Sequence, residues 1–452
     1  MSTIHTGSTP KSAWWRSRGT LDRLLSGRAN SFGLLRLLLA TSVVYSHVFP
    51  LSTLNGEDPL WRISGHQTDV GKMAVVGFFV LSGYMITSSG ERLGTGRYVW
   101  HRILRIFPGL WVNVLITALV VAPLLFIHLH GSTAGFWHSS EGPFEYIRGT
   151  STTAISSGYD ISKVMATAMH RGLADNIGLD GALWSLRYEL FCYVVVAILA
   201  AGGALRRAPK TVPLLALLLW SSMVINLMDA PTLRGFPSES STSISVPVLG
   251  GLNTHYLVYL GFAFLLGASF RLFRHRFHIN DVCGVLSAVL VLATFHWGAF
   301  AVIGYPAFAY LLIWLGVRLP SWLHWVGRKH DYSYGMYIYG FVVEQVLRIL
   351  YHANTWGTYR YFATAAGITL VVAVLSWHLV ESQAMKLKNW TPPTGWIPAA
   401  LRPGHGARHA VEQPAAASAA TGPSTGPSTG PSVGSGPGTG TESESARVGN
   451  GV

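Results

Sequence analysis

Long apolar segments recur along most of this chain, and they limit what it can fold into. Half of the 452 residues are hydrophobic and only 12% are charged. Because about 20 predominantly apolar residues suffice for a helix to cross a bilayer, the sequence predicts an all-α fold, a polytopic transmembrane helical bundle with about ten crossings. These crossings are expected near residues 32–52, 71–90, 106–128, 182–202, 211–229, 255–271, 279–297, 299–317, 331–351 and 361–380.

The net charge of +13 fits membrane topology better than nucleic-acid binding. Basic residues gather in alternate loops between apolar runs, as the positive-inside rule predicts, and they form no single patch. With a cytoplasmic N-terminus every inner loop is a basic one, so both termini are expected in the cytoplasm. The inner loops carry Arg92, Arg97, Arg102, Arg105, Arg206, Arg207, Lys210, Arg271, Arg274, Arg276, Arg318, Arg328, Lys329, Lys386 and Lys388.

Composition divides the chain into three regions. Residues 1–30 are polar and basic, and we expect a cytoplasmic segment there rather than a cleaved signal peptide. Residues 31–390 form the predicted membrane domain. Residues 391–452 contain the repeat TGPSTGPSTGPS and are rich in small and polar residues, which predicts a disordered cytoplasmic tail.

Two outer segments, 129–181 and 230–254, are longer than most connections between helices. Loops of that length commonly bind ligands, so we expect them to carry a binding function or to cover a cavity. The two cysteines, Cys192 and Cys283, lie inside apolar runs without the spacing of a zinc site. Buried free thiols and no metal are therefore expected.

The first predicted crossing carries two ionisable side chains, Arg36 and His47, in the stretch SFGLLRLLLATSVVYSHVFPL. An arginine at the centre of a membrane helix costs about 2.5–3.5 kcal/mol on insertion scales, so such residues usually mark function. Eleven residues at about 100° each return the pair to one helix face, about 16 Å apart along the axis. Taken alone, this helix is equally compatible with chemistry across the membrane and with a snorkelling Arg36 and a core His47.

A second basic site begins the third crossing, in RYVWHRILRIFPGLWV. Arg102 and Arg105 are three residues apart, so they share a helix face at the cytoplasmic surface, and Pro108 either kinks the helix or starts it. Paired guanidinium groups suit a phosphorylated cytosolic ligand, because arginine makes bidentate contacts with phosphate. Ordinary positive-inside flanking is the competing interpretation, and for this pair alone it is favoured.

Three buried carboxylates are candidates for chemistry or for structural pairing. Glu189, in ALWSLRYELFCY, is expected about 10 Å below the outer face, at nearly the depth of His47, where it can orient the imidazole or an acceptor hydroxyl. Pairing of Glu189 with a neighbouring polar group is the structural alternative. Glu344 is expected to pair with Arg348 four residues on, and Glu381 to be structural, with Lys386 and Lys388 close by.

With these residues placed, the chain resembles the membrane-bound acyltransferase type 3 family, the O-acetylases of O-antigen, exopolysaccharide and similar glycans. The resemblance covers about residues 30–390 and rests on an ordered set of motifs. These are Arg36 and His47 with ten residues between them, GFFVLSGY (77–84), Arg102 with Arg105, LWSLRYE (183–189), SYGMYIYGF (333–341) and HLVES (378–382).

The sequence also departs from the family pattern. Gly340 stands where many members have histidine, so the ninth crossing cannot supply an imidazole at that position. Asp180 and Ala182 replace an asparagine and a serine that often precede the LW pair. The hydrolase-like domain fused to some members is absent from this sequence, and these departures leave the acceptor open.

The resemblance implies an O-acyltransferase in the inner or plasma membrane of a bacterium. It implies acetyl-coenzyme A, or another acyl-coenzyme A, as the donor, and an extracytoplasmic or membrane-bound glycan hydroxyl as the acceptor, with membrane lipids around it and no metal. In this hypothesis Arg36, Arg102 and Arg105 hold the coenzyme's phosphates, and its pantetheine arm reaches up the bundle. His47 takes the acceptor's proton or carries the acyl group, and Glu189 orients His47 or the acceptor.

Two other functions remain open at this point. A transporter also uses intramembrane charges, but its inverted repeats and broken helices are not evident in the sequence. An acyl relay would pass the group to a separate partner enzyme, which the missing fused domain permits.

Overall fold

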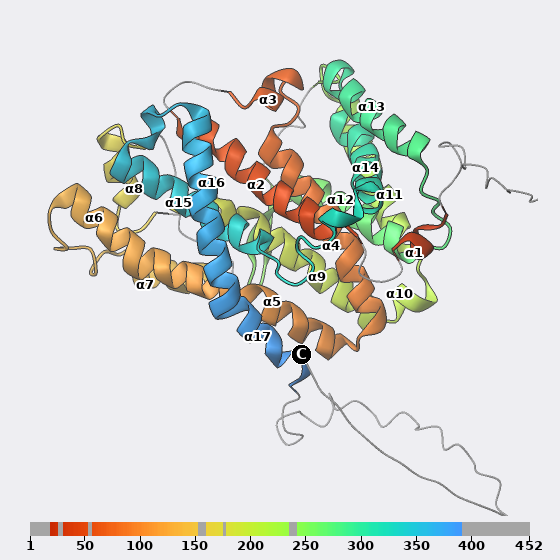
Figure 1. Cartoon of the computed structure of the whole chain (residues 1–452), viewed down its shortest axis with the longest axis horizontal. Helices are drawn as coiled ribbons and strands as arrows, with labels where there is room; N and C mark the ends of the chain where they lie inside the picture. The colour runs from red at the N-terminus through yellow and green to blue at the C-terminus, as the bar shows by residue number, and fades with distance from the viewer. Residues whose placement is uncertain are drawn as a thin grey trace, which may run out of the picture. The chain divides into compact units, whose positions relative to one another are not determined.

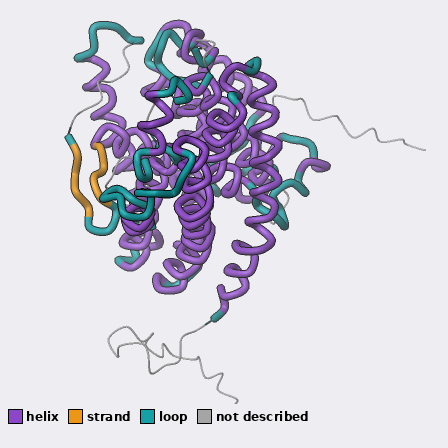
Figure 2. The backbone as a smooth tube through the Cα atoms, turned by 90° about the vertical axis from the view of Figure 1, so that its left-hand side faces the viewer, coloured by secondary structure: helices purple, strands orange, loops and turns teal. Residues whose placement is uncertain are grey.

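The computed structural model describes residues 19–25, 30–52, 57–151, 160–174, 178–234 and 242–390. Within this part the fold is almost entirely helical, and its only sheet is one two-stranded hairpin (Figures 1 and 2). The predicted polytopic helical bundle is confirmed. The tail predicted for residues 391–452 lies outside the described residues, as do residues 1–18 of the predicted N-terminal segment.

Eight helical segments of the described chain are long and apolar enough to cross a bilayer. They are α2 (Phe32–Leu51), α4 (Val70–Arg92), α5 (Thr95–Ile116) continued by η1 (Thr117–Val121) and α6 (Ala122–His130), η2 (Gly181–Ser185) with α9 (Leu186–Ala201), α11 (Thr211–Met228), α12 (Thr254–Leu272), η3 (Phe300–Gly304) with α14 (Tyr305–Arg318), and α16 (Thr358–Ser376) continued by η6 (Trp377–Glu381), α17 (Ser382–Lys386) and η7 (Leu387–Asn389).

Two more helices match the remaining predicted crossings in position. The first, α13 (Asp281–Trp297), is apolar but only 17 residues long, and the second, α15 (Ser333–Tyr351), carries buried polar side chains that lower its hydropathy. The count of ten crossings and the cytoplasmic side of the termini stay predictions. Cys283 on α13 is exposed, which corrects the expected burial, because the neighbouring side chains of this helix face outward.

The shorter elements connect these helices. They are α1 (Leu21–Leu24), α3 (Pro59–Ile63), α7 (Pro143–Thr150), α8 (Val164–His170), α10 (Ala204–Arg207), β1 (Ser243–Val246), β2 (Gly250–Asn253), η4 (Ser321–Leu323) and η5 (Ala353–Thr355). The strands pair antiparallel, with Ser243 opposite Asn253. Helix α1 is anchored by the buried Leu21, whose amide donates to the carbonyl of Phe277.

The third crossing begins at Thr95, eleven residues before its predicted start at 106. The predicted start was placed directly after Arg105, where the uncharged run begins. Arginine is a good helix former, however, and the helix includes both Arg102 and Arg105. It also runs on through Pro108, which neither starts nor ends it. Both arginines therefore lie well inside α5 rather than at its first turn.

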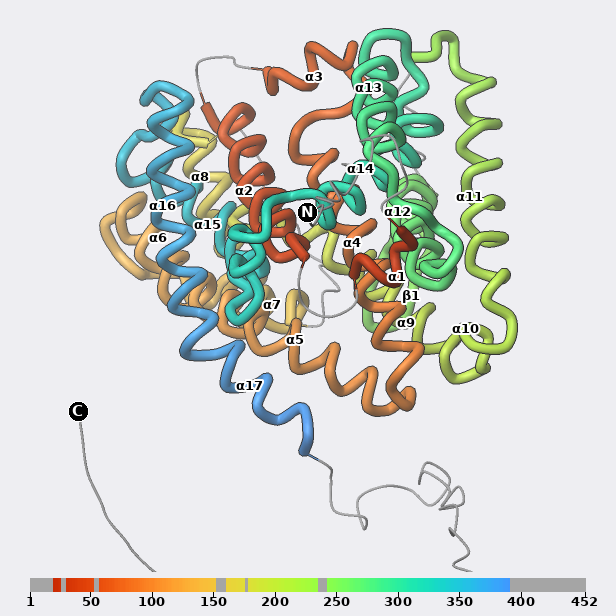
Figure 3. Tube along the Cα trace, turned by 45° about the vertical axis from the view of Figure 1, so that its right-hand side comes forward, coloured from red at the N-terminus to blue at the C-terminus, as the bar shows by residue number. Residues whose placement is uncertain are grey.

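Helices α2, α4, α12 and α15 form the centre of the bundle (Figures 1 and 3). The contact between α4 and α12 is close because glycines face each other across it. A Cβ atom on Gly83 would lie 2.0 Å from the carbonyl oxygen of Phe264, and one on Gly267 would lie 1.9 Å from that of Val80. Small residues allow this approach between helices in a membrane.

We expect Gly83→Ala to destabilise the bundle by about 3 kcal/mol, since the added methyl group meets backbone that cannot move aside. The matched control is Gly367→Ala, where an added Cβ has nothing within 4 Å. Thermal unfolding in detergent measures the difference between the variants. Equal midpoints for Gly83→Ala and Gly367→Ala would show that α4 and α12 move apart readily enough to accommodate the added methyl group.

Candidate active site

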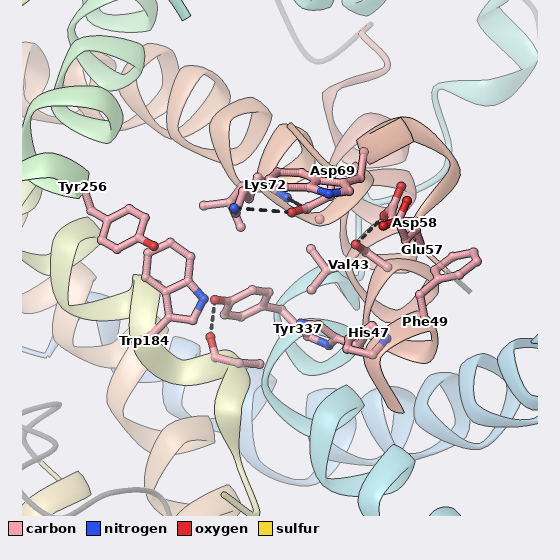
Figure 4. Close-up of a pocket in the computed structure, with 16 residues that line it drawn as sticks. Val43, His47, Phe49, Glu57, Asp58, Asp69, Lys72, Trp184, Tyr256 and Tyr337 are labelled. Carbon is pink, nitrogen blue, oxygen red and sulfur yellow. Dashed lines mark hydrogen bonds and ion pairs between the residues drawn. The ribbon is translucent and has the colours of Figure 1, made fainter. Parts of the chain in front are cut away.

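His47 borders a cavity of about 480 Å³ between α2, the start of α4, η2, α12 and α15 (Figure 4). Aromatic side chains form much of its wall, and carboxylates lie toward the connection between α2 and α4. The aromatic residues include Trp61, Trp184, Tyr256 and Tyr337, and the charged ones are Glu57, Asp58, Asp69 and Lys72. Such a mixture offers flat apolar faces together with hydrogen-bond acceptors, which suits a hydroxyl-rich ligand.

The connection between α2 and α4 contributes to this cavity, although no sequence motif indicated this role. Asp58 accepts hydrogen bonds from the Ser46 hydroxyl at 2.7 Å and from the amides of Leu60 and Val70 at 2.8 and 3.0 Å, which fixes the connection against α2. The described residues of the long segments 129–181 and 230–254 do not line the cavity. A binding or covering role for these segments stays a prediction, and Ala182, which directly follows the first of them, lines the cavity.

The carboxylate that faces His47 belongs to Glu344. Glu344 Oε2 lies 3.3 Å from His47 Nδ1, and the ring of Phe341, one turn earlier on α15, meets the imidazole edge-on at 4.9 Å between ring centroids. Glu344 is completely buried, whereas the His47 side chain keeps 21% of its exposure. The imidazole is therefore backed by a carboxylate and open toward the cavity.

This geometry corrects two predicted pairings. Glu344 was expected to pair with Arg348 along its own helix, yet its carboxylate lies against His47. Glu189 was expected to meet His47, but it accepts hydrogen bonds from Ser82 at 2.8 Å and from Tyr193 at 2.5 Å. The residues of η2 form a 3-10 helix, which rises about 2.0 Å per residue, and this carries Glu189 deeper than an α-helical count suggests.

Replacing Glu344 with glutamine is expected to lower kcat about 10²-fold, since the amide cannot stabilise the imidazolium that forms as His47 takes a proton. The measurement is kcat of the purified variant, with its thermal unfolding midpoint as the check on folding. A kcat within a few-fold of wild type would show that Glu344 does not act through His47.

At the other end of α2, a carboxylate brings two of the predicted arginines together. Asp331, in the connection before α15, accepts from Arg36 Nη1 at 2.5 Å and from Arg105 Nη2 at 2.8 Å. Arg105 Nη1 also lies 2.5 Å from Glu381 Oε2. Glu381 is thus held in an ion pair, as a structural residue would be, but its partner is Arg105 rather than Lys386 or Lys388.

Arg102 is held differently from the other two arginines. Its guanidinium lies over the ring of Tyr193, 5.9 Å from the centroid, and its buried Nε has no hydrogen-bond partner among the described residues. Because Tyr193 in turn donates to Glu189, Arg102 and Glu189 both contact this tyrosine of α9. Of the three arginines predicted to bind a coenzyme, Arg36 and Arg105 are therefore paired with carboxylates, whereas Arg102 forms no ion pair within the described residues.

The remaining motif residues mostly set helix spacing. Ser82 of the GFFVLSGY segment donates to Glu189, and Tyr337 of the SYGMYIYGF segment hydrogen-bonds to Ser185 at 2.7 Å. A Cβ on Gly340 would lie 2.9 Å from Val44, so α2 and α15 approach closely just below His47. Asp180 is fully buried and accepts from Asn113 at 2.6 Å.

Among the residues that the structure describes, no three histidine, cysteine or acidic side chains gather in a way that could hold an ion. The arrangement offers proton transfer at His47, backed by Glu344, and anion binding by Arg102 on α5.

Comparison with known proteins agrees with this arrangement. A family model described as an acyltransferase domain matches residues 30–378. An O-acetyl transferase from Shigella phage Sf6 is 26% identical over 363 residues, which cover 79% of this chain and 96% of the phage protein. Nodulation protein 10 from Rhizobium leguminosarum bv. viciae is 26% identical over 375 residues, covering 80% of this chain and 95% of that protein. No solved structure matches the chain.

The family model spans more than three quarters of the chain and includes the arginine and histidine of α2, the arginines of α5 and the carboxylates of α9 and α15. A multi-pass helical bundle with an imidazole–carboxylate pair at a cavity agrees with that match. The chain belongs to the acyltransferase type 3 family and is an O-acyltransferase.

Proposed function

We propose that the protein transfers an acyl group, in the simplest case acetyl, from cytosolic acyl-coenzyme A to a hydroxyl of a glycan at the outer side of the plasma membrane. The single observation that supports this most is the cavity at His47, whose imidazole is backed by Glu344 on one side and open on the other. The aromatic and acidic walls of the cavity suit a sugar. Arg102 on α5, which forms no ion pair within the described residues, suits the phosphates of a coenzyme.

His47 acts as the general base in this proposal. With Glu344 beside Nδ1, that nitrogen holds the imidazole proton and leaves Nε2 to accept the proton of the acceptor hydroxyl. The hydroxyl oxygen attacks the thioester carbonyl, the carbon–sulfur bond breaks, and His47 returns the proton to the departing coenzyme thiolate. Atoms and charge balance, because the hydroxyl proton ends on the thiol.

Glu189 lies on α9 between the cavity at His47 and Arg102, where the donor's pantetheine arm would run. It lies on α9 five residues after Trp184 of the cavity and four before Tyr193, over which Arg102 lies. Its carboxylate, fixed by Ser82 and Tyr193, is placed to accept a hydrogen bond from an amide of the extended pantetheine arm. In this proposal Glu189 positions the donor rather than His47.

Purified protein in detergent, supplied with radiolabelled acetyl-coenzyme A with and without a glycan acceptor, tests the proposal. Label should appear in the glycan only when both substrates are present. A transporter would transfer no label to either, and an acyl relay would release or hold labelled acetyl without modifying the glycan. Either result would overturn direct transfer.

A further inference from the structure

We infer that Lys388 and Arg102 together form the phosphate site for the donor at the inner end of the bundle, whereas Arg36 and Arg105 chiefly hold the helices together. Lys388 has no assigned role beyond a flanking charge. This inference rests on the proposed function, because it assumes that the donor is a coenzyme A thioester.

The first step is the charge balance of Arg36 and Arg105. Both donate to Asp331, at 2.5 and 2.8 Å, and Arg105 also contacts Glu381 at 2.5 Å. A guanidinium matched by carboxylates at these distances has its charge compensated and its donors engaged. A phosphate would have to displace a carboxylate to bind there, and the displaced carboxylate would stay buried without its partner.

Arg102, unlike Arg36 and Arg105, has a charge that no described carboxylate compensates. It lies about one turn before Arg105 on α5 and forms no ion pair within the described residues. The ring of Tyr193 fixes its guanidinium from one side, and its buried Nε–H has no described acceptor. An oriented arginine with an unsatisfied donor is prepared for an anion, because a buried donor without an acceptor is unfavourable.

Lys388 is brought to the same place by the end of the C-terminal helical segment. The Trp100 indole donates to the carbonyl of Leu387 at 3.0 Å, and the His101 ring contacts the carbonyl of Lys388 at 3.2 Å. These two bonds fix η7 against the residues of α5 that directly precede Arg102. Lys388 itself is half-buried and forms no ion pair in the described part of the chain.

Lys388 and Arg102 lie on segments that pack together, and neither forms an ion pair within the described residues. Two cations held together without a matching anion repel each other, so their arrangement is unfavourable until an anion joins them. A phosphate group supplies the missing charge. Lys386, two residues earlier, differs in that it is exposed and donates to Gln383 at 2.6 Å.

The neighbouring side chains favour a nucleotide as the source of that phosphate. The rings of Trp100 and Trp390 lie 5.7 Å apart beside Lys388, and Trp390 is 48% exposed. An exposed indole next to a cation pair suits an adenine ring with its phosphates. A lipid headgroup provides the same phosphate chemistry without the base, and the experiment must separate the two.

The test is calorimetric titration of the full chain with coenzyme A in phosphatidylcholine nanodiscs. Loss of one charge-assisted contact of about 1.5–3 kcal/mol corresponds to a roughly 10- to 100-fold weaker affinity. We expect a loss of that size for Lys388→Ala and for Arg102→Ala, partial recovery for Lys388→Arg, and wild-type affinity for the control Lys386→Ala. A size-exclusion profile like that of wild type shows that each variant is folded.

Three results would overturn the inference. If wild-type protein binds no coenzyme A, the proposed donor is wrong and the inference fails with it. If wild type binds but Lys388→Ala and Lys386→Ala have equal affinities, the proposed function stands and this site alone is refuted. If Lys388→Ala binds coenzyme A normally but loses binding of phosphatidylglycerol added to the nanodiscs, the site belongs to a lipid headgroup.

Discussion

Replacing His47 with alanine is expected to reduce acyl transfer by about 10²–10⁴-fold while the helical bundle stays folded. The imidazole is the one group at the cavity that is both backed by a buried carboxylate and exposed to a bound hydroxyl. Its removal eliminates the proton acceptor without opening a large void, because the side chain already borders open space. The measurement is the rate of labelled acetyl transfer by purified protein at saturating donor.

The matched control is His138→Ala, which removes an exposed imidazole in the segment between α6 and α7. It should transfer at the wild-type rate. His47→Ala should also bind coenzyme A as tightly as wild type, since the proposed phosphate site, at Arg102 and Lys388, does not include the cavity at His47. Transfer by His47→Ala within a few-fold of wild type would contradict its role as the general base.

Replacing Asp331 with alanine is expected to destabilise the protein by about 3–5 kcal/mol. The carboxylate lies between Arg36 and Arg105, and its loss leaves two guanidinium groups close together with only Glu381 to balance them. Removing one partner of a buried ion pair costs far more than removing an exposed one. Thermal unfolding in detergent should show a clearly lower midpoint.

A second substitution tests the explanation for this loss. In Arg36→Met/Asp331→Ala the unpaired guanidinium is removed together with its partner, so part of the lost stability should return. The exposed pair Glu145 and Arg148 provides the control, because Glu145→Ala breaks an ion pair with little burial and should leave the midpoint nearly unchanged. If the double variant is less stable than Asp331→Ala, the ion pair is not the cause.

The helical bundle was predictable because apolar runs of membrane length are a local property of the sequence. The positions of the helices follow from those runs, and the errors occur where charge interrupts a helix without ending it. The start of α5 is the clearest case, since the arginines that mark the membrane surface in sequence lie inside a continuous helix. Similarly, the last crossing extends as far as Asn389, beyond its apolar part.

The candidate site was predictable only in part. The sequence singled out His47 and the arginines, because ionisable groups in apolar helices are conspicuous, but it assigned His47 the wrong carboxylate and assigned the arginines none. Depth counted along ideal helices suggested Glu189 for His47, whereas the partner is Glu344 on α15. Asp331 belongs to no motif, and its contact with Arg36 joins positions 295 residues apart, so neither composition nor spacing indicates it.

The ion network around Asp331 also has a consequence for the order in which the protein is made. Synthesis delivers Arg105 into the membrane 226 residues before Asp331 and 276 residues before Glu381. During that interval the early helices carry arginines whose counter-charges do not yet exist, and these must be tolerated by water, lipid headgroups or an insertion factor. Asp331 supplies the first counter-charge and Glu381 the second, so neutralisation of the earliest helices waits for the last two crossings.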